Sequence, residues 1–407
     1  MKKISLLHVF CAIHLFCHSQ DFKSELLRIK EKNNLVGISV CLVKDGKVVF
    51  TFNDGLRDID RNLPVTEHTV YRIASVSKMV TVSALMQLYE KGLFKLDDDV
   101  SEYLGFKLRN PNFPDKPVTF QMLMSHTSSI RDGAGYDNFL SASYTQKPFP
   151  LLSSVLVPGG VFYTDDIWSK TDAPGCGYFQ YVNLNFGILG TLVERISGER
   201  FDKYCIDHIF KPLGMNASFD VRDIPDINNM AVLYRKEDGK WVPQNDNWRG
   251  VRPADRALGD YKIGSNAVLF APQGGLRVSA ADLTKFMIAH MNNGKYGKVR
   301  ILADSTAKRM HKVVWSYNGN NGFSEKDFYT NYALAFMRTD KLVPGVGLIG
   351  HSGDAYGLLS GLYYSEKDKS GIVFMTNGGE WKPGAYSGWQ TIEEDVMTAC
   401  YKFLRSK

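Results

Sequence analysis

The chain has 407 residues, of which 44% are hydrophobic and 23% charged, so it can bury one large core or fold as two to three ordinary domains. Its formal net charge is +6 at pH 7, and no dense Lys/Arg run with interleaved aromatic residues appears, so we expect no nucleic-acid partner. The sequence also has no H-E-x-x-H motif and no clustered His/Cys ligands, so we expect neither a metal nor a cofactor.

The first 20 residues are typical of an export signal. Lys2 and Lys3 precede an apolar run over residues 4–17, and small or polar residues follow. That run is too short to cross a bilayer, and no later stretch is long and apolar enough to do so. We therefore expect a signal peptide over 1–20, no transmembrane segment, and an exported mature chain, 21–407, that is periplasmic or secreted.

Four cysteines remain after the leader, and they are widely spaced without any CxxC pair. This pattern argues against a zinc knuckle or a redox motif. An oxidising compartment permits disulfides, but the spacing leaves the pairing open, and buried free thiols fit equally well. The four are Cys41, Cys176, Cys205 and Cys400.

The mature chain opens with the pattern of a helix and a hairpin. Residues 22–33, FKSELLRIKEKN, suit an amphipathic helix. The runs 36–44 (VGISVCLVK) and 47–53 (KVVFTFN) predict two strands, and Asp45-Gly46 between them predicts a tight turn.

Helical patterns dominate the middle of the chain, and strand patterns return near its end. The expected helices are 77–91, 120–125, 184–197, 201–210, 280–292 and 391–404, and the expected strands are 332–338, 358–365 and 371–376. We therefore predict an α+β fold. An α/β sandwich lobe, from about 21–70 and 330–407, has a central antiparallel sheet flanked by helices, and a mostly helical lobe spans about 75–290. A small-molecule site is expected in the cleft between them.

The first candidate for chemistry is the Ser75-Val76-Ser77-Lys78 stretch at the start of the predicted helix 77–91. Ser75 would lie near the first turn, where free N–H groups and the helix dipole stabilise negative charge. A lysine desolvated beside a serine can lose its proton and take that of the hydroxyl, which activates the nucleophile. The alternative is a capping serine beside a solvated lysine. A second S-x-x-K match, 305–308, has nothing around it that indicates chemistry.

Two further motifs follow in chain order. Tyr181-Val182-Asn183 leads into the helical run LNFGILGTLVERISG, and Gly350-His351-Ser352-Gly353 precedes the strand-like run LLSGLYYS. With S-x-x-K, these motifs resemble those of the serine β-lactamase and penicillin-binding protein superfamily. The likeness is to the branch that holds class C β-lactamases, D-Ala-D-Ala carboxypeptidases, D-aminopeptidases and related esterases.

Flanking blocks extend this resemblance from about residue 22 to the C-terminus and imply a β-lactamase/transpeptidase-like fold. They are YRIASVSK, KGLFKLDDDVSEYL, LMSHTSSI, HIFKPLGM and PQGGLRVSAADLTKFM. The segments 136–138 and 329–331 also fit Y-x-N, but only Tyr181 precedes the Gly187 and Gly190 pattern of the family. Tyr181 is therefore the candidate.

The resemblance implies a role for each residue of the first two motifs. Ser75 would be the nucleophile that forms an acyl-enzyme, and Lys78 would be the general base. Tyr181 would be a general acid/base that shares the proton with Lys78. Asn183 would orient Lys78 and the substrate.

The third motif departs from the family pattern at two residues. His351 stands where class C β-lactamases carry a lysine, as in peptidases and some esterases of this branch. Ser352, Gly353 and Asp354 would bind substrate, with the backbone N–H groups of Ser75 and Asp354 forming an oxyanion hole. If Asp354 points into the cleft, its charge opposes a substrate carboxylate. If the Asp354 side chain instead points to solvent or pairs with an arginine, its charge does not oppose a substrate carboxylate.

The three motifs and the resemblance together predict a serine hydrolase. It would act through an acyl-serine intermediate on amide, peptide or ester bonds of a small-molecule or peptide substrate. DD-peptidase, D-aminopeptidase and esterase activities all fit. The alternatives are a true β-lactamase and a catalytically silent penicillin-binding or scaffold module; the oligomeric state stays open. We expect His126 to be a structural turn residue and Gly274-Gly275 to shape the cleft floor. Segment 232–262 either edges the cleft or lies on the surface.

Overall fold

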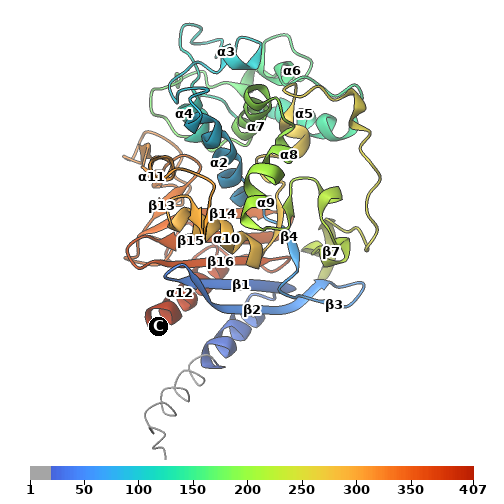
Figure 1. Cartoon of the computed structure of the whole chain (residues 1–407), viewed down its shortest axis with the longest axis vertical. Helices are drawn as coiled ribbons and strands as arrows, with labels where there is room; N and C mark the ends of the chain where they lie inside the picture. Colours follow the sequence, from blue (N-terminus) through green and yellow to red (C-terminus); the bar gives the residue numbers. More distant parts are fainter. Residues whose placement is uncertain (1–19) are drawn as a thin grey trace, which may run out of the picture.

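A nine-stranded antiparallel sheet is built from both ends of the chain (Figure 1). The computed structural model describes residues 20–407, so nearly all of the predicted signal peptide lies outside the described residues. In sheet order the strands are β11 (Trp315–Ser316), β12 (Asn331–Tyr332), β13 (Met337–Thr339), β14 (Leu348–Ala355), β15 (Leu358–Ser365), β16 (Ser370–Thr376), β1 (Gly37–Lys44), β2 (Lys47–Asp58) and β3 (Leu63–Pro64). The predicted antiparallel sheet is confirmed.

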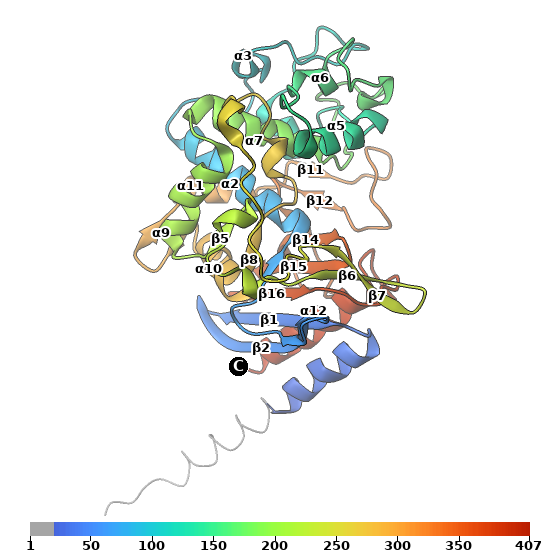
Figure 2. The ribbon, with the colours of Figure 1, turned by 90° about the vertical axis from the view of Figure 1, so that its right-hand side faces the viewer.

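The central strands β16 and β1 are buried on both faces. Their pairing places Ile38 opposite Thr376 and Lys44 opposite Ser370. Alternate side chains of β1 enter two separate apolar clusters, because successive residues of a strand point to opposite faces. One cluster packs against α10 (Ala280–Met291), and the other against α12 (Thr391–Arg405) and the N-terminal helix, residues 20–32. Helices thus cover both faces of the sheet (Figures 1 and 2).

A mostly helical region lies beyond one face of the sheet, with α2 (Ser77–Glu90) packed against α7 (Leu184–Ser197) at its centre. Helix α2 is apolar on nearly every side and is correspondingly buried. Gly187 and Gly190 allow the segment 267–272 to pack closely on α7, since a Cβ at Gly190 would lie 2.6 Å from Pro272 Cγ.

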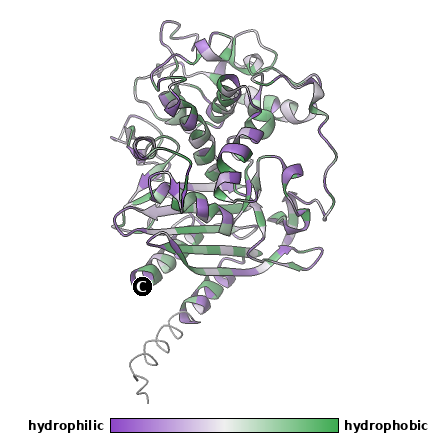
Figure 3. Ribbon diagram, viewed as in Figure 1, coloured by the Kyte–Doolittle hydropathy of each residue, from purple (hydrophilic) through white to green (hydrophobic). Residues whose placement is uncertain are grey.

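The remaining elements are short. The helices are α3 (Ser101–Leu104), α4 (Phe120–Met124), α5 (Ala134–Thr145), α6 (Ser153–Leu156), α8 (Phe201–Cys205), α9 (Lys211–Leu213) and α11 (Asp304–His311). Three small sheets join β4 (Val70–Arg72), β8 (Arg277–Ser279) and β5 (Ala217–Ser218); β6 (Leu233–Glu237) and β7 (Lys240–Asn245); and β9 (Lys295–Tyr296) and β10 (Val299–Arg300). Figure 3 shows hydrophobic residues along the central strands and hydrophilic residues along outer loops.

Several sequence predictions differ from the structure. The expected strand 332–338 is a hairpin: the Ala333 N–H donates to the Phe336 carbonyl at 2.7 Å, and Ala335 has φ 60°. The turn residues are apolar and include no glycine or proline, so the sequence pattern of 332–338 indicates one continuous strand. Strand β14 was not predicted because its glycines and polar residues have low strand propensity. The helix expected over 201–210 ends at Cys205 and continues as a π-helical turn.

All four cysteines of the described chain are free thiols. Cys41, Cys205 and Cys400 are buried, and Cys176 is exposed. Burial raises the pKa of the Cys41 thiol to about 11, so it stays protonated at neutral pH. None of the helices within residues 20–407 combines the length and apolarity needed to cross a bilayer.

Candidate active site

Ser75 lies in a single 3₁₀ turn, Ala74–Val76, that leads directly into α2. Ala74 has φ 46°, a left-handed conformation that is uncommon for residues other than glycine. Strand β14 crosses this turn closely: a Cβ on Gly353 would lie 2.4 Å from the Ile73 carbonyl oxygen. Glycine at 353 therefore lets the strand backbone approach the Ile73 carbonyl, two residues before Ser75.

Lys78 is fully buried, and its Nζ has three polar neighbours. It lies 3.0 Å from Ser75 Oγ, 2.8 Å from Asn183 Oδ1 and 2.8 Å from the Gln273 carbonyl oxygen. Desolvation lowers the pKa of the Lys78 ammonium to about 7, and the carboxylate of Asp132 opposes this fall. A neutral amine has two N–H donors and one lone pair. The Asn183 and Gln273 oxygens can take both donors, which leaves the lone pair for the Ser75 hydroxyl proton.

Asn183 is held by Asp132, a residue that the sequence analysis missed. The Asp132 carboxylate accepts from the Asn183 backbone N–H at 2.8 Å, from Asn183 Nδ2 at 3.0 Å and from the Leu184 N–H at 2.9 Å. These bonds satisfy free N–H groups at the start of α7 and turn Asn183 Oδ1 toward Lys78. Desolvation raises the pKa of the Asp132 carboxyl, and the hydrogen bonds oppose that rise.

Tyr181 points its hydroxyl into the same site. Within the described chain this buried oxygen has no hydrogen-bond partner. Desolvation raises the pKa of the Tyr181 phenol far above its usual range, and the nearby Ser75 hydroxyl opposes the rise. The His126 ring stacks on Tyr181 at 4.4 Å, and His126 Nδ1 accepts the Val182 N–H at 2.9 Å. His126 therefore positions the second motif from a turn.

His351 lies in the middle of β14, next to the site, and is almost completely buried. Its Nδ1 is 2.5 Å from the Ser352 carbonyl oxygen, and its Nε2 is 3.1 Å from the Tyr332 hydroxyl. Since a carbonyl only accepts, Nδ1 carries the proton, and Nε2 accepts from Tyr332. Burial lowers the pKa of His351 to about 3, with the Lys78 charge adding to the fall. The third motif thus presents a neutral imidazole.

Ser352 turns to the other side of β14. Its hydroxyl donates to Glu393 Oε1 at 2.8 Å and accepts from Trp389 Nε1 at 3.1 Å. Glu393 belongs to the first turn of α12, where its Oε2 also accepts the Gln390 N–H at 3.0 Å. Burial raises the pKa of the Glu393 carboxyl to about 7. No local motif marks Glu393, because it is 41 residues from Ser352 in the sequence.

A cavity of about 290 Å³ opens beside Ser75, and Tyr181, His351, Ser352, Asp354 and Glu393 also line it. The exposed Asp354 carboxyl makes no ion pair within residues 20–407, although Arg235 lies close enough to oppose the desolvation that raises its pKa. Tyr329, from a rejected Y-x-N match, also lines the cavity and stacks on Tyr181 at 5.2 Å.

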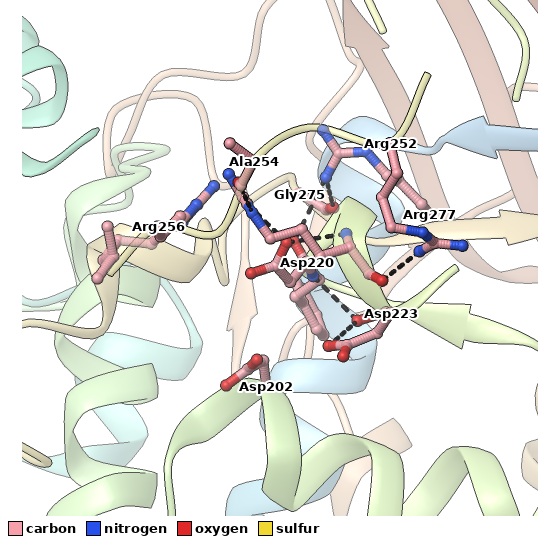
Figure 4. A network of polar contacts seen from close by, with 12 residues as sticks. Asp202, Asp220, Asp223, Arg252, Ala254, Arg256, Gly275 and Arg277 are labelled. Carbon is pink, nitrogen blue, oxygen red and sulfur yellow. Dashed lines mark hydrogen bonds and ion pairs between the residues drawn. The ribbon is translucent and has the colours of Figure 1, made fainter. Parts of the chain in front are cut away.

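The other candidate segments lie elsewhere. Lys308, of the second S-x-x-K match, pairs with Asp304 at 2.7 Å in α11. No residue of 232–262, a segment described throughout, lines the Ser75 cavity. Its second half crosses the network in Figure 4, where Arg252 donates to the Ile224 carbonyl at 2.8 Å and the Ala254 carbonyl accepts from Arg222 at 2.6 Å.

The comparisons with known proteins show the family and the fold. The family model described as Beta-lactamase matches residues 24–396. The chain belongs to the beta-lactamase family. Protein flp of Staphylococcus aureus (strain MRSA252) is 29% identical over 185 residues, which cover 46% of this chain but only 35% of flp. A beta-lactamase of Yersinia enterocolitica is 27% identical over 371 residues, covering 86% of this chain and 84% of that protein.

Two solved structures share the fold. The octameric penicillin-binding protein homologue from Pyrococcus abyssi has a TM-score of 0.68 and 24% identity, covering 94% of this chain and 76% of that one. The D-alanine carboxypeptidase AmpC from Burkholderia cenocepacia has a TM-score of 0.65 and 21% identity, covering 96% and 99%. The predicted family and the β-lactamase/transpeptidase-like fold are therefore confirmed.

Proposed function

We propose that this chain is a serine hydrolase that cleaves amide, peptide or ester bonds through an acyl-serine intermediate. One observation carries the proposal: the buried Lys78 amine lies 3.0 Å from the Ser75 hydroxyl, while Asn183 and Gln273 hold its other side. A base within hydrogen-bond reach of a nucleophile, itself oriented by a third group, is the arrangement that nucleophilic catalysis needs.

Each step of the reaction has a group to perform it. Ser75 Oγ attacks the substrate carbonyl carbon as its proton passes to Lys78 Nζ. The negative charge that forms on the carbonyl oxygen is stabilised by the backbone N–H groups of Ser75 and Asp354, an interaction worth about 3 kcal/mol per donor. The proton then passes, with Tyr181 as relay, to the leaving group as its bond to the carbonyl carbon breaks. Water attacks the acyl-enzyme in the reverse sequence and frees Ser75.

Two groups position this machinery without touching the reacting atoms. Asp132 fixes Asn183 and so the direction of the Lys78 amine. The neutral His351 adds no positive charge beside Lys78, so it does not compete with that amine for a proton. The leader at 1–20 supports export to the periplasm or the medium.

Two alternatives to this hydrolase, a true β-lactamase and a silent binding module, predict different experimental outcomes. A true β-lactamase is favoured by the likeness to the Yersinia enterocolitica protein, but β-lactams carry a carboxylate, and Asp354 lines the cavity beside Ser75. A silent binding module would keep the fold without turnover. Hydrolysis of nitrocefin faster than a neutral ester would favour the β-lactamase, and absence of any covalent labelling would favour the module.

Labelling with a fluorescent fluorophosphonate tests the proposal. The wild-type protein should acquire one covalent label, and Ser75→Ala should acquire none. Ser305→Ala is the matched control, because Ser305 is the exposed serine of the second S-x-x-K match and lies in α11, outside the cavity. Equal labelling of Ser75→Ala and the wild type would refute the proposal.

A further inference from the structure

The cavity beside Ser75 is acidic and aromatic. Glu325, Asp354 and Glu393 are carboxylates in its wall, and among residues 20–407 no lysine or arginine side chain lines it. Aromatic side chains, including Phe328 and Tyr329, lie in the same wall. We propose that this cavity binds a positively charged ammonium group of the substrate. This inference rests on the proposed function and names its substrate class.

The position of Tyr181 indicates which part of the substrate carries the charge. Tyr181, the proposed proton relay to the leaving group, lines this cavity together with Ser75, and its buried hydroxyl has no partner in the described chain. A leaving group that takes its proton from Tyr181 must depart on that side. The ammonium group therefore belongs to the leaving group, or to the part of the substrate next to it.

Aromatic rings in the cavity wall are also compatible with a bound cation. Tyr181 stacks on Tyr329 at 5.2 Å, and Phe328 meets the Tyr329 ring edge to face at 4.7 Å. Faces of aromatic rings attract cations, and cages of such rings bind quaternary ammonium groups. A metal ion is a poor alternative, because no group of three acidic, histidine or cysteine side chains in the described chain is arranged to hold one.

The start of α12 faces this cavity and would by itself favour an anion. Two N–H groups at this end are already used by a capping box, in which the Gln390 side chain and the Glu393 carboxylate each accept a backbone N–H. A carboxylate of the protein therefore already lies at this helix start, where its charge opposes a bound anion. The pKa values of the Glu325, Asp354 and Glu393 carboxyls are all raised, mainly by desolvation, and a bound cation would stabilise their charged forms.

Three acetyl thioesters whose thiol leaving groups are cationic, neutral and anionic test the inference. They are acetylthiocholine, which carries trimethylammonium, its neutral tert-butyl isostere, and the acetyl thioester of mercaptopropionate, which carries a carboxylate. The released thiol is measured with a chromophoric reagent after the exposed Cys176 thiol has been alkylated. We expect kcat/KM for the cation to exceed that for the neutral isostere by about tenfold, with the anion slowest.

Charge-removing variants locate the effect. In Asp354→Asn and in Glu325→Gln, the ratio of kcat/KM for the cation over the neutral isostere should fall by about threefold each, because both carboxylates are exposed and partly screened. Glu31→Gln is the matched control, since it removes one exposed acid from the N-terminal helix, outside this cavity, and it should leave the ratio unchanged. Equal values of kcat/KM for the cation and the neutral isostere, or a ratio that neither variant lowers, would overturn the inference.

Binding separates a failure of this inference from a failure of the proposed function. If no thioester is hydrolysed and Ser75 takes no label, the proposed function fails. Calorimetric titration of the three thioesters into Ser75→Ala still decides the inference. Tighter binding of the cation than of the neutral isostere supports an ammonium site, and equal or weaker binding overturns it.

Discussion

Replacing Asp132 by asparagine tests how the site holds its base. Asp132 accepts three hydrogen bonds of 2.8 to 3.0 Å from Asn183 and Leu184. An asparagine side chain of the same shape has one acceptor oxygen, and its NH₂ group would face a donor. At least one bond is lost, Asn183 Oδ1 turns away from Lys78, and the amine loses its orientation.

The expected loss of kcat/KM in Asp132→Asn is estimated from the hydrogen bonds that Asp132 accepts. A hydrogen bond to a charged group contributes about 1.5 to 3 kcal/mol, and the exposure of Asp132 reduces this to about 1 to 2 kcal/mol. If that free energy is lost from the transition state, kcat/KM falls about 5- to 30-fold. Loss of the carboxylate also lowers the pKa of Lys78 below its value of about 7, because Asp132 stabilises the charged amine.

The assay is the pH profile of kcat/KM for a neutral ester. In Asp132→Asn the rising limb should lie at lower pH than in the wild type, with a lower plateau. Asp166→Asn is the matched control: Asp166 accepts the Ala134 N–H at 2.9 Å at the start of α5, but it is not among the charges that act on Lys78. An unchanged profile in Asp132→Asn, with melting temperature preserved, would refute the reasoning.

Three further outcomes are expected. For the wild type, kcat/KM should rise with pH through about 7 and then level off, because only neutral Lys78 accepts the Ser75 proton. A kcat/KM that stays constant from pH 5 to 9 would contradict this. Asp246→Ala should lower the free energy of unfolding by about 3 to 5 kcal/mol, since it leaves the buried Arg277 guanidinium without its carboxylate; urea titration measures it, and a loss under about 1 kcal/mol would count against that pair. Gly353→Ala should slow fluorophosphonate labelling at least tenfold, because the new Cβ meets the backbone close to Ser75. If the variant is labelled as fast as the wild type, the close approach of β14 is not needed.

The sequence predicted the parts of the site that local patterns encode. Ser75 and Lys78 are one helical turn apart, so their proximity follows from helix geometry. Tyr181 and His351 were assigned to the site from their likeness to family motifs, and both line the same cavity. Asp132 and Glu393 could not be found in this way, because their partners are 51 and 41 residues away and only the tertiary fold brings them together.

The charge state of the site also lay beyond the sequence. His351 reads as a replacement for a lysine, yet its protonation depends on the Tyr332 hydroxyl and the Ser352 carbonyl that surround it. Tyr332 itself lay in a segment predicted as one strand. The turn after it pairs β12 with β13, which in turn pairs with β14, and the Tyr332 hydroxyl then reaches His351. Burial and hydrogen-bond partners decide a pKa, and neither is visible in a residue pattern.

The most direct test of the account is to locate and time the covalent adduct by peptide mass spectrometry. We expect the fluorophosphonate adduct to form on Ser75. Lys78→Met, which fills the same buried space without a base, should slow its formation at least about 100-fold. An adduct on any other residue, or an equal rate of Ser75 modification in Lys78→Met, would contradict it.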